Sequence, residues 1–428
     1  MKKVLLITYY WPPAGGPGVQ RWLRFVTYLR EFGVDPVLFI PENPEYPLQD
    51  QSLIEEVPAD IRIYQLKITE PLQWAGKFLR KDVKRISSGI ISERKPSLLE
   101  SLLIWIRGNF FIPDARVLWV RPSVAYLKKV LRAEDIDTVI TTGPPHSLHL
   151  IGLQLKKDSG IRWIADFRDP WTSIGYHKKL KLGPLASNKH KALEKEVLMS
   201  ADKILVTSRT TGKEFEALTS IPVIVITNGY EEKDYRTAQA VPDSHFTISH
   251  IGSLLAGRNP TALWKALRTL AEENHDFRKA LRLQLAGVIS PEVLESIKDH
   301  GLEPYLEQLE YMPHSGVVRM QRQTQVLLLI EINSEETRGI LPGKLFEYLA
   351  AKRPVLAIGP EGWEAGDIIR ETGAGAVFGY DSGNEILHLL KDWFERYEKG
   401  SLQVDPAGIE KYSRRELTRK LAKELLWE

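Results

Sequence analysis

Short runs of consecutive apolar residues recur along the chain, each followed by a turn rich in Gly or Pro and then by a helical period. Uninterrupted apolar runs of this length are typical of parallel strands that are covered on both faces. In the first half, the pattern predicts a helix over residues 19–32, ended by Gly33, and strands at residues 4–8, 37–40, 138–142, 163–166, 204–207 and 223–226. This alternation predicts a doubly wound α/β domain over residues 1–230.

A second series of the same kind follows a polar stretch, residues 231–245, which has no apolar period and is interpreted as a linker. Strands are expected at residues 247–251, 282–285, 306–311, 325–330, 355–358 and 376–378, and helices at residues 261–273, 291–300, 343–351 and 385–395. We therefore expect a second α/β domain over residues 246–405. A charged amphipathic helix within residues 406–428 could cross back to the first domain.

Composition argues against cysteine chemistry and against a membrane-spanning helix. The chain has 428 residues and no cysteine, which excludes disulfides, a thiol nucleophile and thiolate zinc sites. No run of about 18 apolar residues occurs, so a spanning helix is not expected. The apolar run after Lys3 stops at Pro12 without a small-residue cleavage site, which favours a buried first strand over a secretory leader. We expect a cytoplasmic protein.

Charge is unevenly distributed. Residues 1–230 hold 33 Lys and Arg against 24 Asp and Glu, and the remainder holds 25 against 31. The segment 73–132 is the most basic, with 13 Lys and Arg against 4 acidic residues, and it carries Trp105 and Phe110. Such an insertion could lie on an anionic membrane at its inner face. The alternative is a solvated helix pair that packs on its own domain. Nucleic acid is not expected, because no RNA-type aromatic motif accompanies the charge.

Two loops could bind phosphate. Gly15-Gly16-Pro17-Gly18 follows the first strand and opens a helix, so its backbone could approach an anion, although its spacing is not that of the dinucleotide fingerprint. The second loop, Leu341-Pro342-Gly343-Lys344, also opens a helix. Glu347 lies one helical turn beyond Lys344, so its carboxylate could accept both ribose hydroxyls while Lys344 neutralises a diphosphate. The alternative is a surface ion pair.

Further motifs occur in a fixed order along the chain: Asp166-Phe167-Arg168-Asp169-Pro170-Trp171, Thr227-Asn228-Gly229-Tyr230, His250-Ile251-Gly252, Tyr311-Met312-Pro313-His314 and Lys344 to Val355. With these motifs and the first Gly-Gly loop, the chain resembles the retaining glycosyltransferases of family 4. The resemblance implies the GT-B arrangement, in which two Rossmann-like domains face each other across a cleft. It covers nearly the whole sequence.

The resemblance also implies that the two domains bind different substrates. The second domain would hold a nucleotide-sugar donor, UDP- or GDP-linked, and the first would hold a sugar or lipid-linked acceptor, with no metal and no further cofactor. Donor-binding positions carried over from the family are Gly15, Gly16, Asn228, Gly229, Met312, Leu341, Gly343 and Glu347. Glu347 matches the ribose-binding glutamate, and the backbone near Met312 matches the place where the base is read.

Two departures from the family pattern concern the donor sugar and the phosphates. The family often has two glutamates separated by seven residues, and the first, which touches the donor sugar, is replaced by Gly339 in this chain. Glu335 or Glu336 could substitute, although a carboxylate shifted by several residues is not an equivalent. Ser253 replaces an expected Arg, and Arg258 stands where Lys is expected. Lys344 could restore the missing positive charge.

Transfer with retention must stabilise a leaving diphosphate, so positioned cations matter more than a nucleophile. Arg258 and Lys344 would neutralise the leaving group. Asp166 and Asp169 follow a predicted strand, at the edge where ligands gather in α/β sheets, and either could orient or deprotonate the acceptor hydroxyl. The alternative is an internal network of these aspartates with Arg168 and Arg162.

Two other function classes remain open at this stage. One is a nucleotide-sugar epimerase of the same fold, and the other is a catalytically silent nucleotide-sugar binder, suggested by Gly339 and Ser253. His146 and His149 have no evident third ligand, so a metal site is not expected. The family resemblance favours a glycosyltransferase of cell-envelope or surface-polysaccharide biosynthesis.

Overall fold

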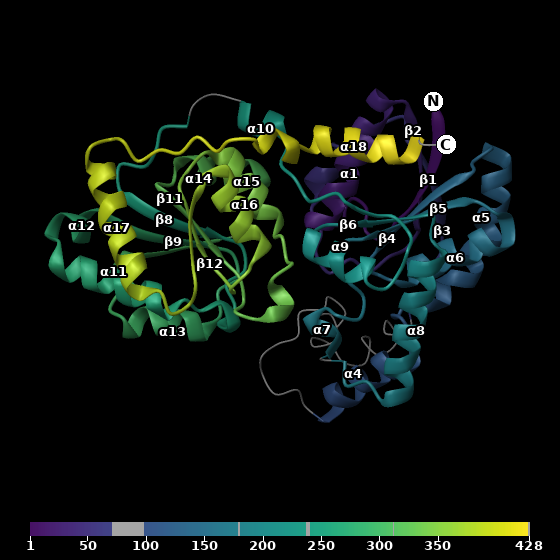
Figure 1. Cartoon of the computed structure of the whole chain (residues 1–428), viewed down its shortest axis with the longest axis horizontal. Helices are drawn as coiled ribbons and strands as arrows, with labels where there is room; N and C mark the ends of the chain where they lie inside the picture. Colours follow the sequence, from purple (N-terminus) through teal and green to yellow (C-terminus); the bar gives the residue numbers. More distant parts are fainter. Residues whose placement is uncertain (71–97, 179, 237–239, 311, 427–428) are drawn as a thin grey trace. The chain divides into compact units, whose positions relative to one another are not determined.

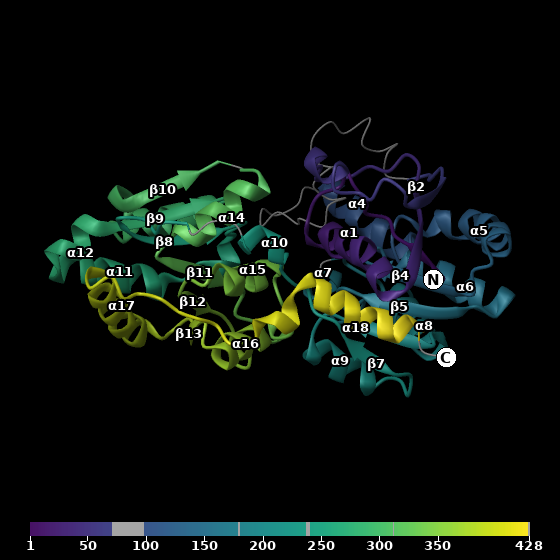
Figure 2. The same ribbon diagram turned by 90° about the horizontal axis from the view of Figure 1, so that it is seen from above.

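The computed structural model describes residues 1–70, 98–178, 180–236, 240–310 and 312–426. The chain divides into two compact units, Met1–Thr227 with Arg414–Glu428, and Asn228–Ser413. Each unit has one parallel sheet with helices on both of its faces (Figures 1 and 2). The architecture is the two-domain α/β fold that the apolar pattern predicts.

The first unit has a seven-stranded sheet in the order β3-β2-β1-β4-β5-β6-β7, and all of its pairings are parallel. Its strands are β1 (Lys2–Ile7), β2 (Val34–Pro41), β3 (Arg62–Leu66), β4 (Thr138–Gly143), β5 (Arg162–Phe167), β6 (Lys203–Val206) and β7 (Val223–Val225). Its helices are α1 (Pro17–Leu29), α4 (Leu98–Phe110), α5 (Val120–Glu134), α6 (Ser147–Ser159), α7 (Gly175–Lys178), α8 (Pro184–Ser200), α9 (Arg209–Glu216) and α18 (Arg414–Leu426).

Alternate residues of the central strands enter two different cores. Leu5 and Ile7 of β1 pack with residues of α5 and α6, whereas Val4 and Leu6 pack with residues of α1 and α18. Side chains of successive strand residues point to opposite faces of a sheet, so a strand between two helical layers must be apolar throughout. This requirement explains the uninterrupted apolar runs in the sequence.

The C-terminal helix belongs to the first unit, where α18 lies beside α1 (Figure 1). Leu421 and Leu425 are fully buried in the same core as Trp22 of α1. At the other end of the helix, Arg414 donates to the side chain of Gln20 at 2.9 Å. The expected crossing helix is therefore part of the first unit's hydrophobic core.

The second unit has a six-stranded parallel sheet in the order β10-β9-β8-β11-β12-β13. Its strands are β8 (Phe246–Ile251), β9 (Leu281–Ala286), β10 (Leu306–Leu309), β11 (Val326–Ile330), β12 (Val355–Ile358) and β13 (Gly375–Phe378). Its helices are α10 (Glu232–Arg236), α11 (Thr261–Glu273), α12 (His275–Ala280), α13 (Pro291–Asp299), α14 (His314–Gln323), α15 (Gly343–Ala351), α16 (Glu364–Thr372) and α17 (Gly383–Glu398). Leu328 and Leu329 of β11 enter opposite cores, as in the first unit.

Three sequence expectations differ from the structure. Strand β3 was not expected, because it is an edge strand with mostly exposed side chains and has no apolar run. Within the expected basic insertion, 73–132, the residues of α5 pack in the main core of the first unit. Residues 71–97, with Lys77, Lys81 and Lys84, lie outside the described residues. Part of the expected linker forms α10, which belongs to the second unit.

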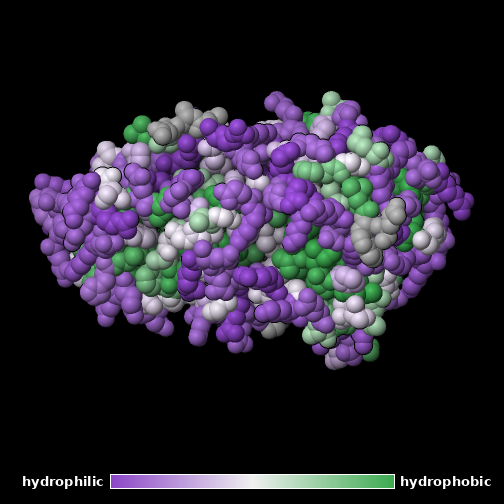
Figure 3. Space-filling model, turned by 45° about the horizontal axis from the view of Figure 1, so that its top comes forward, coloured by the Kyte–Doolittle hydropathy of each residue, from purple (hydrophilic) through white to green (hydrophobic). Residues whose placement is uncertain are grey.

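On the face drawn in Figure 3, hydrophilic residues cover most of the surface and hydrophobic ones gather in small areas. Within the described ranges, no helix combines the length and apolar character that crossing a bilayer requires.

Candidate functional site

The centre of the second unit's sheet is a topological switch point. From β8 the chain continues to β9 and β10 on one side, whereas β11 continues to β12 and β13 on the other. In open parallel sheets, ligands bind beyond the carboxyl ends of the strands at such a point. A ligand site is therefore expected at the loops that follow β8 and β11. The helix α15 begins close to both loops.

Arg258 lies in the short helical turn after β8 and pairs with Glu331, the first residue after β11. Its Nε and Nη2 atoms lie 3.1 and 2.8 Å from Glu331 Oε1. The Glu331 side chain is 2% exposed and that of Arg258 is 26% exposed. The guanidinium group is thus anchored from the protein side and partly open to solvent.

Lys344, in the first turn of α15, lies next to the end of β8. Its Nζ is 3.4 Å from His250 Nε2, and His250 Nδ1 is 2.9 Å from the Leu328 carbonyl oxygen. Burial lowers the pKa of Lys344 to about 8, and the charge of Arg258 acts in the same direction. A Cβ atom on Gly252 would lie 2.8 Å from Lys344 Nζ, so a larger residue there would displace the ammonium group.

Glu347 lies on the next turn of α15 and is partly exposed. Its Oε2 accepts a hydrogen bond of 2.9 Å from Gln321 Nε2, and Gln321 Oε1 accepts one of 2.6 Å from the Tyr235 hydroxyl. Gln321 is fully buried. This chain of bonds fixes one carboxylate oxygen of Glu347 and orients the side chain.

The remaining second-unit positions that the family resemblance assigns to donor binding lie in three segments of the chain. Leu341 is buried in the loop before α15, and Gly343 is the first residue of that helix. Met312 packs against a small apolar cluster that contains Ile251 at the end of β8. Asn228 and Gly229 begin the second unit, next to the pairing of Tyr230 with Ser413.

The structure thus brings Arg258 and Lys344 together, with Glu347 one turn further along α15. Glu335 does not join them as a replacement for the first family glutamate, the one missing at Gly339, because its side chain is 85% exposed and pairs with Arg338. Glu331 was not a candidate in the sequence, since its only signal is a charged residue directly after an apolar strand.

In the first unit, the switch point lies between β1 and β4. Gly15 and Gly16 lie in the loop after β1, and Gly16 precedes α1 with φ of 105°, a conformation that favours glycine. Gly15 N donates to the Leu48 carbonyl oxygen at 3.0 Å. The expected position of this loop, after a first strand and before a helix, is confirmed.

Asp166 is part of an internal network, which is the alternative that the sequence left open for this residue. Its carboxylate is fully buried and accepts from Trp22 Nε1 at 2.8 Å and Thr142 Oγ1 at 2.7 Å, with Arg21 Nη2 at 3.3 Å. The network was expected with Arg168 and Arg162. Both instead donate to backbone carbonyl groups, those of Gly143 and Pro144 and that of Glu424 respectively.

Asp169, three residues beyond Asp166, is only partly buried. Burial raises the pKa of its carboxyl group, opposed by the charge of Arg168 and assisted by that of Asp166. Of the two aspartates, Asp169 is the less buried residue.

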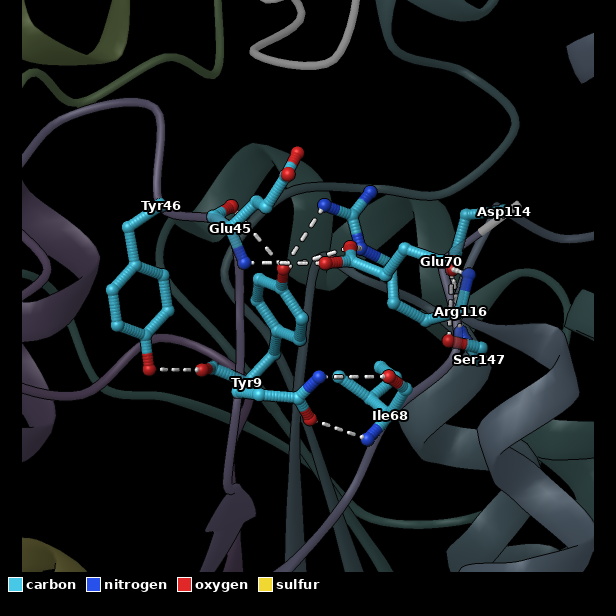
Figure 4. Close-up of polar contacts among 9 residues, drawn as sticks. Tyr9, Glu45, Tyr46, Ile68, Glu70, Asp114, Arg116 and Ser147 are labelled. Carbon is cyan, nitrogen blue, oxygen red and sulfur yellow. Dashed lines mark hydrogen bonds and ion pairs between the residues drawn. The ribbon is translucent and has the colours of Figure 1, made fainter. Parts of the chain in front are cut away.

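A buried polar cluster at the carboxyl edge of the first sheet was not foreseen in the sequence (Figure 4). The Tyr9 hydroxyl donates to Glu70 Oε1 at 2.8 Å, and Arg116 Nε lies 3.0 Å from the same oxygen. Glu45 N donates to Glu70 Oε2 at 3.2 Å. The cluster joins loops that follow β1, β2 and β3 to the segment before α5, and no sequence signal connects residues so far apart.

His146 and His149 are buried in the loop and helix after β4. Both ring nitrogens of His146 lack a hydrogen-bond partner among the described residues, and its ring stacks on Trp171 with centroids 5.0 Å apart. Burial lowers the pKa of both histidines, that of His149 to about 3. Over the described part of the chain, no group of three or more His, Asp or Glu side chains could hold a metal ion.

Comparisons with solved structures support the fold. The Anabaena protein Alr3699/HepE in complex with UDP-glucose is 13% identical, with a TM-score of 0.60 over 99% of this chain and 99% of that chain. Sucrose-phosphate synthase from Thermosynechococcus elongatus is 13% identical, with a TM-score of 0.58 over 99% and 95%. A putative UDP-N-acetylglucosamine 2-epimerase from Listeria monocytogenes is 13% identical, with a TM-score of 0.54 over 99% of this chain and 96% of that chain.

No curated protein matches the sequence. The family model described as Glycosyltransferase Family 4 matches residues 18–234, which is half of the chain. With the two parallel sheets of the GT-B fold, this match shows that the chain belongs to glycosyltransferase family 4.

Proposed function

We propose that this glycosyltransferase moves a sugar from a UDP- or GDP-linked donor to an acceptor hydroxyl with retention, in cell-envelope or surface-polysaccharide biosynthesis. One observation carries the donor assignment: Arg258 and Lys344 lie together at the carboxyl edge of the second sheet, with Glu347 one turn along α15. Two cations next to a hydrogen-bond acceptor suit a diphosphate followed by a ribose.

In this proposal the bond between the anomeric carbon and the diphosphate oxygen breaks, and the oxygen keeps the electron pair. Arg258 and Lys344 stabilise the negative charge that develops on the leaving group. Preorganised cations in a partly buried site are effective because they need little rearrangement during the reaction. The acceptor oxygen forms the new bond to the anomeric carbon on the face that the diphosphate leaves. Asp169 orients this hydroxyl, and its proton passes to Asp169 or to an oxygen of the departing diphosphate.

The proposed reaction uses no metal ion and no cofactor besides the donor. The positive charge that a metal would supply to the diphosphate comes from Arg258 and Lys344 in this account. Activity should therefore persist when a chelator is added, and complete loss on chelation, restored by a divalent cation, would contradict this part of the proposal.

A peripheral contact with anionic membrane is proposed for the first unit. Three large apolar side chains of α4 are exposed, those of Leu102, Trp105 and Phe110, and the two aromatic rings lie 5.7 Å apart. The exposed Lys181 donates to Ser101 of the same helix at 3.0 Å. Apolar side chains beside a lysine suit the surface of an anionic bilayer, where a lipid-linked acceptor would be found.

Incubation with a panel of UDP- and GDP-sugars, with and without candidate acceptors, tests the proposed function. Nucleotide release that depends on acceptor, with the anomeric configuration kept in the product, is expected. Conversion of the sugar without release would favour an epimerase, as the similar structure from Listeria monocytogenes is described. Saturable binding without either reaction would indicate a silent binder. Both of these results contradict the proposal.

A further inference from the structure

The buried Glu331 carboxylate has more partners than a simple ion pair. Its Oε1 atom accepts from Ile332 N at 2.9 Å as well as from Nε and Nη2 of Arg258. Its backbone carbonyl oxygen accepts from the Tyr380 hydroxyl at 2.8 Å. The residue is 1% exposed, so water cannot substitute for these contacts. Glu331 is thus held rigidly by β11 and by the segment after β13.

Two positive groups, Arg258 and Lys344, lie near this carboxylate and near one another. The charges of Arg258 and Lys344 repel each other strongly enough to contribute to the lowered pKa of Lys344. Their only ligand in our account, a diphosphate, is absent before the donor binds. A buried lysine beside an arginine tends to lose its proton unless a negative charge compensates.

The groups that face Lys344 are few. His250 of β8 is 3.4 Å away and fully buried, and burial together with the Lys344 charge lowers its pKa, so it is neutral. Arg258 adds positive charge. Glu331 and Glu347 add negative charge and favour the protonated lysine. Glu347 is partly exposed and bonded to Gln321, whereas Glu331 is buried and bonded to Arg258.

We propose that Glu331 is a positioning residue of the donor site, the internal counter-ion that aims Arg258 at the diphosphate and lets Lys344 stay charged beside it before the donor binds. The role for the diphosphate rests on the proposed function. The electrostatic role of Glu331 toward Lys344 can be measured in the protein without ligand. The role in diphosphate binding and the electrostatic role toward Lys344 can therefore be disproved independently.

The first test is the pH dependence of Lys344 acetylation by acetic anhydride in the ligand-free protein, followed by mass spectrometry of the peptide. In the wild type, reactivity should reach half its maximum near the pKa of about 8. In Glu331→Gln the midpoint should fall by about one pH unit, because a neutral amide no longer compensates the ammonium charge. An unchanged midpoint would overturn the proposal.

Glu272→Gln is the matched control, since it makes the same change in an exposed Arg–Glu pair of the second unit. Its Lys344 midpoint should equal that of the wild type. Arg258→Gln should shift the Lys344 midpoint in the opposite direction. This variant still tests the coupling if Glu331→Gln does not fold. Removal of the repelling charge should raise the Lys344 midpoint, and a fall or no change would contradict the electrostatic coupling.

The second test is titration with UDP and with GDP at pH 6.5 and pH 8.5. From pH 6.5 to pH 8.5, the nucleotide affinity of Glu331→Gln should fall about fivefold more than that of the wild type. The reason is that Lys344 of the variant is neutral at the higher pH. Parallel pH profiles for the two proteins would overturn the role in donor binding. If the wild type binds neither nucleotide, the proposed function fails, and the acetylation result still decides the role of Glu331 toward Lys344.

Discussion

The guanidinium group of Arg168 occupies the space that a Cβ atom on Gly18 would need. Arg168 Nε donates to the Gly143 carbonyl oxygen at 3.2 Å, and its Nη2 donates to that of Pro144. The arginine therefore joins the end of β5 to the loop after β4 and packs against the first turn of α1. Gly18 is needed for this contact rather than for a special backbone conformation.

Replacing Gly18 with Ala should displace Arg168 from both carbonyl groups. Because the guanidinium group is anchored, we expect a loss of about 1–3 kcal/mol in the free energy of unfolding. Chemical denaturation of the variant measures this. Gly383→Ala is the control, since its Cβ would make only an ordinary contact with Ala262. Equal stabilities of the two variants would contradict the account of Gly18.

The two aspartates after β5 should respond differently to the same substitution. Asp166→Asn leaves the buried Arg21 without its negative partner, so we expect a loss of about 3 kcal/mol or more in stability. Asp169→Asn should keep the fold and lower kcat by at least about tenfold, if its carboxylate orients or deprotonates the acceptor. Thermal unfolding and steady-state kinetics separate these effects. A stable, active Asp169→Asn variant would remove Asp169 from the mechanism.

Buried histidines should make the first unit sensitive to acid. Burial lowers the pKa of His146, His149, His177 and His190, that of His149 to about 3 and that of His177 to about 4. The unfolded chain binds these protons from about pH 6.5 downward, and the folded chain does not. Stability is therefore complete above pH 6.5 and falls as the pH decreases, by about 3 kcal/mol at pH 4.5 for a fully buried histidine.

Thermal unfolding between pH 8 and pH 4.5 measures this effect, and His146→Phe supplies the comparison. The phenylalanine ring keeps the stacking on Trp171 and cannot bind a proton. Its unfolding temperature should fall less steeply below pH 6.5 than that of the wild type. Identical slopes would show that His146 is not neutral in the folded protein.

The exposed aromatic residues of α4 should govern membrane binding. Replacing Trp105 and Phe110 with Ser removes apolar area that a bilayer would cover, so sedimentation with anionic vesicles should fall at least about tenfold. Leu218→Ser, another exposed apolar residue of the first unit, should leave sedimentation unchanged. Sedimentation unaffected by the double substitution would contradict the proposed contact, as would equal binding to neutral vesicles.

The sequence predicted most of the sheet strands because they are buried on both faces and leave uninterrupted apolar runs. It missed β3, whose exposed Arg62 and Gln65 break such a pattern at the sheet edge. Tertiary structure, rather than local pattern, makes Arg62–Leu66 a strand by pairing it with β2.

The residues of the candidate site also include some that the sequence predicts and some that it does not. Lys344 and Glu347 could be predicted because both lie on one helix, where spacing alone places them on neighbouring turns. Glu331 could not, because its partner Arg258 is 73 residues away in the sequence. Asp166 was ambiguous for the same reason, since Arg21 precedes it by 145 residues and only the folded sheet brings them together.

The proposed binding of the donor's nucleotide at Arg258, Lys344 and Glu347 is tested most directly by affinity measurements. The affinities for UDP and GDP are compared between the wild type and Glu347→Ala. Glu347 is held by Gln321 at the edge where Arg258 and Lys344 gather, and its loss should remove about 2 kcal/mol or more of binding free energy, about thirtyfold in Kd. Glu385→Ala, an exposed change on α17, is the control and should bind as the wild type does. We predict tight binding of one nucleotide by the wild type, weakened only in Glu347→Ala. Equal affinities of the folded wild type and Glu347→Ala would contradict the account.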